Sequence, residues 1–225
     1  MKRRIFTAAI MTGTMFIFYG VAGAIPLANT VYFEDFESKS LLTEWTNSNT
    51  SFDSNVTFYL GDYTTNSSTI LTLTGLGAHT ELALDFDLYL FGSWDGENTT
   101  YGKDYFGLMG DGVDDIWTFT NHQTQGQTYP GSPSEIYGSG SSATYVYRDF
   151  DLTGTGTGIN IAHTGDTFSM TFYSNTTQSD EWWGIDNVQV SINNDTPIPE
   201  PATMLLFGTG LVGLLGAKRR KNKKQ

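Results

Sequence analysis

The sequence contains no cysteine. This excludes disulfide bonds, thiol nucleophiles and cysteine-ligated zinc sites. An exported protein could have used disulfides, so this one must be held by burial of a core, with bound metal as a possible supplement. The middle of the chain, residues 25–195, is long enough for one sizeable domain without such staples.

Basic residues are nearly absent from this middle part. Of the 12 lysines and arginines, only Lys39, Lys103 and Arg148 lie there, whereas nearly all of the 24 acidic residues do. The resulting acidic surface repels nucleic acid and anionic lipid, which excludes nucleic acid as a partner. It favours solubility and can attract divalent cations.

Motifs of the common hydrolases are also absent. The three histidines, His79, His122 and His163, accompany neither G-x-S-x-G nor H-E-x-x-H. A pair of carboxylates for glycoside hydrolysis stays open as an alternative, because sequence spacing alone selects no pair among so many acids. We therefore expect a protein that is not an enzyme.

The chain starts with MKRRIFTAAIMTGTMFIFYGVAGA. A basic start, an apolar run and a small-x-small site at Ala22 and Ala24 occur in the order of a secretory signal peptide. We expect residues 1–24 to be removed after export by the Sec machinery. The alternative is a membrane anchor or a buried helix.

Residues 25–195 have the pattern of an all-β domain, and no sustained helical periodicity is found there. Apolar residues alternate along three segments: Leu82, Leu84, Phe86, Leu88 and Leu90; Phe168, Met170 and Phe172; and Val188, Val190 and Ile192. A period of two indicates half-buried strands. We predict an antiparallel β-sandwich of the jelly-roll or concanavalin-like type, with Arg148 at a sheet edge and residues 121–143 as a mobile surface loop.

The C-terminal 30 residues, 196–225, differ from the body. Three prolines at positions 197, 199 and 201 predict an extended linker. Residues 202–217 carry no charge, and as a helix they would cover about 24 Å, slightly less than the ~30 Å hydrocarbon core of a bilayer. The basic end, 218–225, would stay cytoplasmic and stop transfer, which predicts a transmembrane helix at 202–217.

This tail resembles the PEP-CTERM sorting signal. The likeness is carried by Pro199, Glu200 and Pro201, then the short apolar helix, then Lys218, Arg219, Arg220 and Lys221. The resemblance implies a substrate of exosortase, a membrane-embedded transpeptidase of Gram-negative bacteria. The protein would pass through the inner membrane as an intermediate and end at the cell surface or in the extracellular matrix.

Two short stretches resemble exported jelly-roll modules such as carbohydrate-binding and MAM-like domains. These are Glu34-Asp35-Phe36-Glu37 and the late segment WGIDNV. The resemblance implies that the first and last strands lie together and that Glu37 and Asp186 hold a structural Ca²⁺. The alternative is a set of acids that cap turns. Residues 93–96 (SWDG) and 102–106 (GKDYF) are also similar to a body type found among PEP-CTERM proteins.

Trp94, in a turn, and Trp182, beside two acids, are the candidate ligand-binding residues, since exposed indoles stack on sugar rings. The alternative for both is packing in the core. We therefore expect a non-enzymatic surface or matrix protein associated with exopolysaccharide. The alternative is a carbohydrate-binding module with a defined sugar site, and an extracellular hydrolase is a third possibility.

Overall fold

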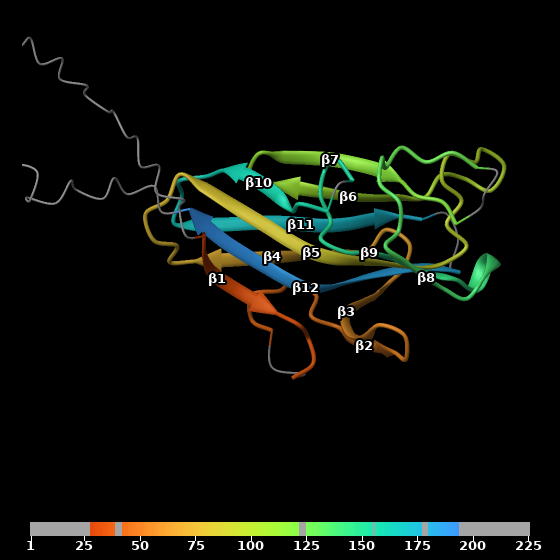
Figure 1. Cartoon of the computed structure of the whole chain (residues 1–225), viewed down its shortest axis with the longest axis horizontal. Helices are drawn as coiled ribbons and strands as arrows, with labels where there is room; N and C mark the ends of the chain where they lie inside the picture. The colour runs from red at the N-terminus through yellow and green to blue at the C-terminus, as the bar shows by residue number, and fades with distance from the viewer. Residues whose placement is uncertain (1–27, 39–41, 122–124, 155, 177–179, 194–225) are drawn as a thin grey trace, which may run out of the picture.

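The computed structural model describes residues 28–38, 42–121, 125–154, 156–176 and 180–193. Within these ranges the chain forms twelve strands, one 3₁₀ turn at Gly140–Ser142 and no α-helix. All strand pairs are antiparallel, and the strands form two layers along the length of the body (Figure 1). The predicted all-β, sandwich-like architecture is confirmed.

The larger sheet has eight strands. Six follow in spatial order: β2 (Thr50–Asp53), β3 (Thr57–Tyr63), β12 (Glu181–Asn193), β5 (Glu81–Gly92), β9 (Thr144–Tyr147) and β8 (Glu135–Tyr137). Two more pair beside this path, β1 (Ala28–Glu34) with β12 and β10 (Ile159–Ala162) with β5. The long strands β5 and β12 therefore form the centre of the sheet.

The smaller sheet has four strands, in the order β4 (Ser68–Thr74), β11 (Thr167–Asn175), β6 (Tyr105–Gly110) and β7 (Val113–Thr118). Leucines of β5 and the alternating Phe168, Met170 and Phe172 of β11 fill the space between the sheets. The alternating apolar side chains of these two strands thus face the core, as the period of two predicts.

A β-bulge at Asn187 changes the side that β12 presents to the core. The register with β5 shifts between Asp186 and Gln189, and Asn187 has φ 50°. An extra residue in one strand reverses the alternation beyond it. Trp182 and Asp186 consequently lie on the outer face of the sheet, whereas Val188 and Val190 lie in the core.

Two local expectations are wrong. Arg148 follows β9, and β9 lies inside the sheet between β5 and β8, so Arg148 does not lie on an edge strand. The segment 121–143 is not simply a surface loop, because its described part contributes strand β8 and the core residue Tyr129. The Tyr129 ring stacks on Phe150 at 4.9 Å between centroids, and this contact holds the segment against the sandwich.

The predicted signal peptide with Ala22 and Ala24, the sorting motif at 199–201, the transmembrane helix and the basic residues 218–221 lie outside the described residues. Within the described ranges, no helix has the length and apolar character needed to span a bilayer.

Candidate functional site

A groove opens on the outer face of the larger sheet, near the start of β12. Its volume is about 340 Å³, within the ~300–1,000 Å³ range of small-molecule sites. Residues from β2, β3, the turn after β3, β5 and β12 line it: Phe52, Asp53, Tyr59, Asp62, Thr64, Phe91 and Trp182. The groove combines four aromatic rings with two carboxylates.

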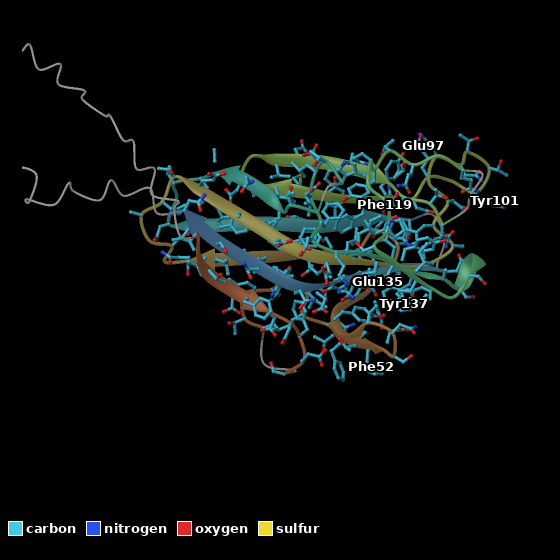
Figure 2. The ribbon with its side chains drawn as sticks, in the orientation of Figure 1. Phe52, Glu97, Tyr101, Phe119, Glu135 and Tyr137 are labelled. Atoms are coloured by element: carbon cyan, nitrogen blue, oxygen red, sulfur yellow. The ribbon has the colours of Figure 1, made fainter. Side chains whose placement is uncertain are left out.

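Three of the aromatic rings form a continuous floor. Phe91 and Trp182 stack at 5.6 Å with an interplanar angle of 4°, and Tyr59 stacks on Phe91 at 5.2 Å. Tyr59 and Phe91 are buried in a second apolar cluster on this outer face, whereas Trp182 is half-buried. Phe52 on β2 is 61% exposed and projects away from the body (Figure 2). The indole of Trp182 and the ring of Phe52 thus remain accessible to a ligand.

Two glycines make room for the Tyr59 ring. Gly61 and Gly184 are register partners on β3 and β12. A Cβ built on Gly184 would lie 2.3 Å from a Tyr59 ring carbon, and one on Gly61 would lie 2.6 Å from it. Since any larger residue would displace the ring, the floor of the groove depends on both glycines.

The carboxylates of the groove accept hydrogen bonds from defined neighbours. The Tyr59 hydroxyl donates to Asp62 Oδ1 at 2.6 Å, and the Ser51 hydroxyl donates to Asp62 Oδ2. Asp53 Oδ1 accepts from the backbone N–H of Asn55 at 2.8 Å. Burial, followed by the hydrogen bond to Asp62 and its negative charge, raises the pKa of Tyr59. The phenol therefore stays protonated and keeps Asp62 in place as an acceptor.

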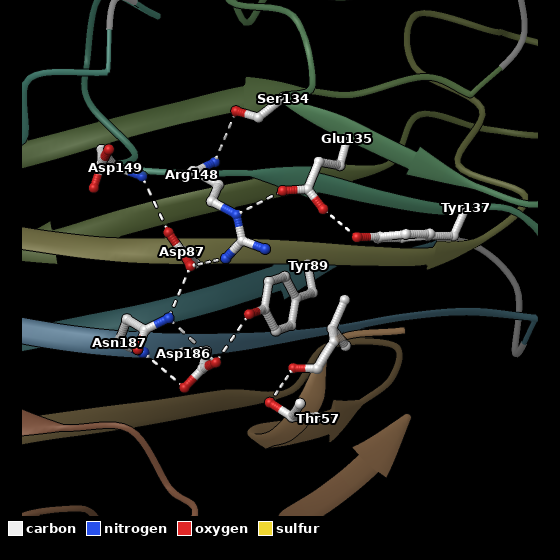
Figure 3. A network of polar contacts seen from close by, with 11 residues as sticks. Thr57, Asp87, Tyr89, Ser134, Glu135, Tyr137, Arg148, Asp149, Asp186 and Asn187 are labelled. Carbon is white, nitrogen blue, oxygen red and sulfur yellow. Dashed lines mark hydrogen bonds and ion pairs between the residues drawn. The ribbon is translucent and has the colours of Figure 1, made fainter. Parts of the chain in front are cut away.

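A polar network lies beside the groove on the same face (Figure 3). Asp87 on β5 is its centre, accepting from Arg148 Nη1 at 2.6 Å and from Asn187 Nδ2 at 2.9 Å. Arg148 also donates through Nε to Glu135 at 3.0 Å. Tyr89, whose ring contacts Tyr59, donates to Asp186 Oδ2 at 2.9 Å and so connects the network to the aromatic floor.

Two carboxyl groups of this face hold their protons unusually tightly. Burial, together with the charges of Asp87 and Glu37, raises the pKa of Asp186 to about 7, against the opposing effect of its bonds from Asn187 and Tyr89. Burial and the charges of Asp149 and Asp87 raise the pKa of Asp85 to about 6. Neither of these two aspartates lines the groove.

The two candidate tryptophans have different positions. Trp182 lies in the groove, as a ligand-binding residue requires. Trp94 is only 1% exposed, and its indole N–H donates to the Phe91 carbonyl at 3.0 Å. The structure therefore corrects the expectation for Trp94: packing, its alternative, accounts for this side chain, because it lies against Phe119 in the core.

The predicted calcium pair is brought into one neighbourhood. β1 pairs with β12, which confirms that the first and last strands lie together, and Glu37 is close enough to raise the pKa of Asp186. Glu37 accepts from the Phe58 N–H at 3.2 Å, and Asp186 accepts from the Asn187 N–H at 2.7 Å. Both act as acceptors within the protein, and calcium binding by this pair stays a prediction.

Sequence reasoning missed a different acidic group. In the described residues, one set of three potential metal ligands lies close together: Asp95, Asp104 and Glu181. Two of them belong to the SWDG and GKDYF stretches, which indicated a fold rather than a site. The third is distant in the sequence and lies there only because β12 pairs with β5.

Comparisons with known proteins give a family for the tail. Residues 197–221 match the family model of the PEP-CTERM protein-sorting motif, which confirms the predicted recognition signal for exosortase. The motif implies export, membrane-anchored transit and a place at the cell surface. No curated protein matches the chain.

Among solved structures, the body is similar to two adhesin domains. One is the K3 cleaved adhesin domain of Lys-gingipain from Porphyromonas gingivalis, with 12% identity and a TM-score of 0.39, and the other is the K2 domain of Lys-gingipain, with 12% identity and a TM-score of 0.37. Each comparison covers 72% of this chain and 98% of the other.

Proposed function

We propose that this protein is a non-enzymatic, exosortase-processed surface protein whose β-sandwich binds extracellular polysaccharide in the groove at Trp182. The observation that supports the binding role most directly is the groove itself, where stacked aromatic rings lie beside fixed carboxylate acceptors. Aromatic faces pack against the C–H faces of sugars, and carboxylates accept from sugar hydroxyls. An extended, partly open floor suits a polymer chain.

A sugar ring would contact the accessible side of the Trp182 indole, because Phe91 covers the other side. Phe52, which also lines the groove and is exposed, would give the sugar a second aromatic contact. Asp53 and Asp62 at the rim would accept hydrogen bonds from its hydroxyls, with Asp62 already oriented by Tyr59 and Ser51. The body's scarcity of basic residues favours a neutral polysaccharide over an anionic one.

A binding test uses the full-length protein in a mild non-ionic detergent on an array of neutral and acidic glycans. Trp182→Ala and Phe52→Ala should each lower the affinity for the preferred glycan by about two- to tenfold, given that aromatic contacts contribute roughly 0.5–1.5 kcal/mol. Ile136→Ala is the matched control, because Ile136 is 54% exposed on β8 and does not line the groove. Unchanged affinity in both groove variants would refute the site.

The hydrolase alternative predicts a different result. Cleavage in this groove would require Asp53 or Asp62 to act on the substrate, because these are its carboxylates. Release of reducing ends by the wild-type protein that disappears in Asp53→Asn would contradict the non-enzymatic role. We expect no such release.

Sorting is tested separately. Replacing Glu200 by Ala should leave the full tail on the mature protein and retain it in the inner membrane, as mass analysis of its two termini would show. An intact C-terminus in the wild-type surface protein would contradict processing at the motif.

A further inference from the structure

The two carboxylates that line the groove accept hydrogen bonds from neutral donors. Asp62 accepts from the Tyr59 hydroxyl at 2.6 Å and from the Ser51 hydroxyl. Asp53 Oδ1 accepts from the backbone N–H of Asn55 at 2.8 Å and from its side-chain amide at 3.0 Å. Asp53 Oδ2 accepts no hydrogen bond from any residue that the structure describes. These bonds orient both carboxylates, and one oxygen of Asp53 is left for a ligand.

Both carboxylates lie close to the aromatic floor of the groove. Burial is the largest cause of the raised pKa of Tyr59, followed by the hydrogen bond to Asp62, and the negative charges of Asp62 and Asp53 add to it. Because the effect of a charge falls with distance, both aspartates lie near the phenol ring. Trp182 and the 61% exposed Phe52 line the same groove. A ligand that packs on these rings would therefore lie beside two negative charges.

The lysine and arginine side chains that the structure describes are paired outside the groove. Arg148 contacts Asp87 at 2.6 Å and Glu135 at 3.0 Å in the network beside the groove (Figure 3). Lys103 contacts Glu97 at 2.5 Å in the loop between β5 and β6. Among the described residues that line the groove, none is a lysine, arginine or histidine. A cleft with charge of one sign attracts ligands of the opposite sign.

A protonated amine matches this groove better than a neutral hydroxyl does. Hydrogen bonds from an ammonium group to a carboxylate are shorter and roughly twice as strong as those between neutral groups. An ammonium group is also attracted to the face of an aromatic ring, most strongly to that of tryptophan. A basic peptide would supply the same charge, but it lacks the flat C–H face with which a sugar ring packs on an indole. The combination of rings and carboxylates therefore favours an amino sugar.

We propose that the groove prefers polysaccharide units that carry a free, protonated amino group, such as glucosamine, over neutral sugars. The sugar face would pack on Trp182, and the ammonium group would pair with Asp53 and Asp62. This inference rests on the proposed sugar-binding function and names the class of sugar that the same groove selects. The acidic body would assist by attracting a cationic polymer from solution.

The test compares three oligosaccharides of equal length and linkage with the full-length protein in a mild non-ionic detergent. The probes are a glucosamine oligomer, its fully N-acetylated form and the glucose oligomer, in which a hydroxyl replaces each amino group. Calorimetry is done at about pH 6, below the pKa of an amine of this type. We expect the glucosamine oligomer to bind about tenfold more tightly than either neutral form, because a cation–π contact and an exposed ion pair each change affinity several-fold.

Ionic strength gives a second readout of the same preference. Raising the salt concentration from about 0.05 M to about 0.5 M should remove most of the preference for the glucosamine oligomer, because exposed charge pairs are screened. The affinity for the glucose oligomer should change little. A tenfold preference that persists unchanged in high salt would contradict recognition of the amine by carboxylates.

Variants separate the groove from the acidic surface as a whole. Asp53→Asn and Asp62→Asn each remove one charge at nearly constant shape, and each should lower the preference for the amino sugar by about two- to fivefold. Asp62 has φ 59°, a conformation that asparagine tolerates, so this substitution keeps the local backbone. Asp114→Asn, an exposed acid on β7 of the other sheet, is the matched control and should keep the full preference. An equal loss in Asp114→Asn would indicate nonspecific attraction of a cation and would overturn the proposal.

The outcomes distinguish this inference from the proposed function. Binding of the neutral oligomers that depends on Trp182 and is as tight as that of the glucosamine oligomer would overturn the inference and leave the sugar-binding function intact. Lack of any glycan binding that depends on Trp182 would refute the sugar-binding function itself. A lysine peptide of the same charge should bind at least tenfold more weakly than the glucosamine oligomer, and equal binding would assign the groove to basic peptides instead. These comparisons use the wild-type protein and Trp182→Ala, so they decide the matter even if an aspartate variant fails to fold.

Discussion

Gly184→Ala tests how strongly the groove depends on the contact between β3 and β12. The added methyl carbon would lie 2.3 Å and 2.7 Å from two ring carbons of Tyr59, and 2.9 Å from the Leu60 carbonyl oxygen. Comfortable contacts between carbons are about 3.5–4.0 Å, so the ring would have to move by about 1 Å. Its hydrogen bond to Asp62 and its stacking on Phe91 oppose that movement.

Two opposing effects decide how much Gly184→Ala changes the free energy of unfolding. Overpacking of this kind costs about 1–3 kcal/mol, and the rigid surroundings of Tyr59 favour the upper end. Replacing glycine by alanine also restricts the unfolded chain, which offsets about 1 kcal/mol. We therefore expect a net loss of about 2 kcal/mol in the free energy of unfolding, or a melting temperature lower by about 4–8 °C. Glycan binding should weaken as well, because the ring forms the floor of the groove.

Urea unfolding of five proteins measures this effect: the wild type, Gly184→Ala, the control Gly77→Ala, Tyr59→Ala and the double mutant of Tyr59 and Gly184. Gly77→Ala is the control, because a Cβ at Gly77 meets nothing within 4 Å, and it should be neutral or slightly stabilising. In a double-mutant cycle, most of the cost of Gly184→Ala should disappear when Tyr59 is already alanine. A change below 0.5 kcal/mol in Gly184→Ala, or an equal cost in both backgrounds, would show that the ring does not depend on this glycine.

Three further predictions concern the polar network and the tryptophans. The pKa of Asp186 is raised to about 7 from an unfolded value near 3.8, so the folded state binds this proton more tightly than the unfolded state does. The stability that the protonated carboxyl contributes is therefore complete below about pH 4 and is lost as the pH rises through 7. Asp186→Asn should therefore reduce the fall in unfolding free energy between pH 4.5 and 8, and an unchanged pH profile would contradict the assignment. Arg148→Ala leaves the 6% exposed Asp87 carboxylate without its guanidinium partner. Urea unfolding should show a loss of about 2–3 kcal/mol in the free energy of unfolding, which is less than for a fully buried pair because Arg148 is itself 37% exposed. Trp94→Ala should cost about 3–5 kcal/mol of stability, whereas Trp182→Ala should cost less and act on glycan binding; equal thermal melting of the two variants would refute this division of roles.

The strands that could be predicted from the sequence are those whose pattern is local. Leu82 to Leu90 alternate without interruption because β5 is regular and buried on one face throughout. The bulge at Asn187 is a single residue, and no period reveals it, although it decides that Trp182 lies outside and Trp183 inside. Trp182 was chosen from the sequence as a candidate ligand-binding residue, and it does lie in the groove. The alternation of apolar residues along β12 alone could not have shown that its side chain lies on the outer face.

The candidate site was harder to predict than the fold because its parts meet through strand pairing over long separations. Asp95 and Asp104 lie within short, recognisable stretches, yet Glu181 joins them only through its register with Gly92. Trp94 was chosen for its position in a turn, but the fold turns its indole inward to the Phe91 carbonyl. A turn in the sequence therefore does not establish that a large aromatic residue is exposed.

The arrangement along β12 connects the body's groove to its sorting tail. Trp182 in the groove lies near the start of this strand, whereas Asn193 at its end pairs with Ala28, so both described ends of the chain leave the sandwich at the same place. Eleven residues of strand separate Trp182 from Asn193, which at about 3.3 Å each corresponds to roughly 36 Å. A body attached through the residues after Asn193 would therefore hold the groove and the acidic cluster at its far end. That geometry suits the proposed function, because a body held through its tail at the membrane would present the groove, where we propose that polysaccharide binds, on the side away from the attachment.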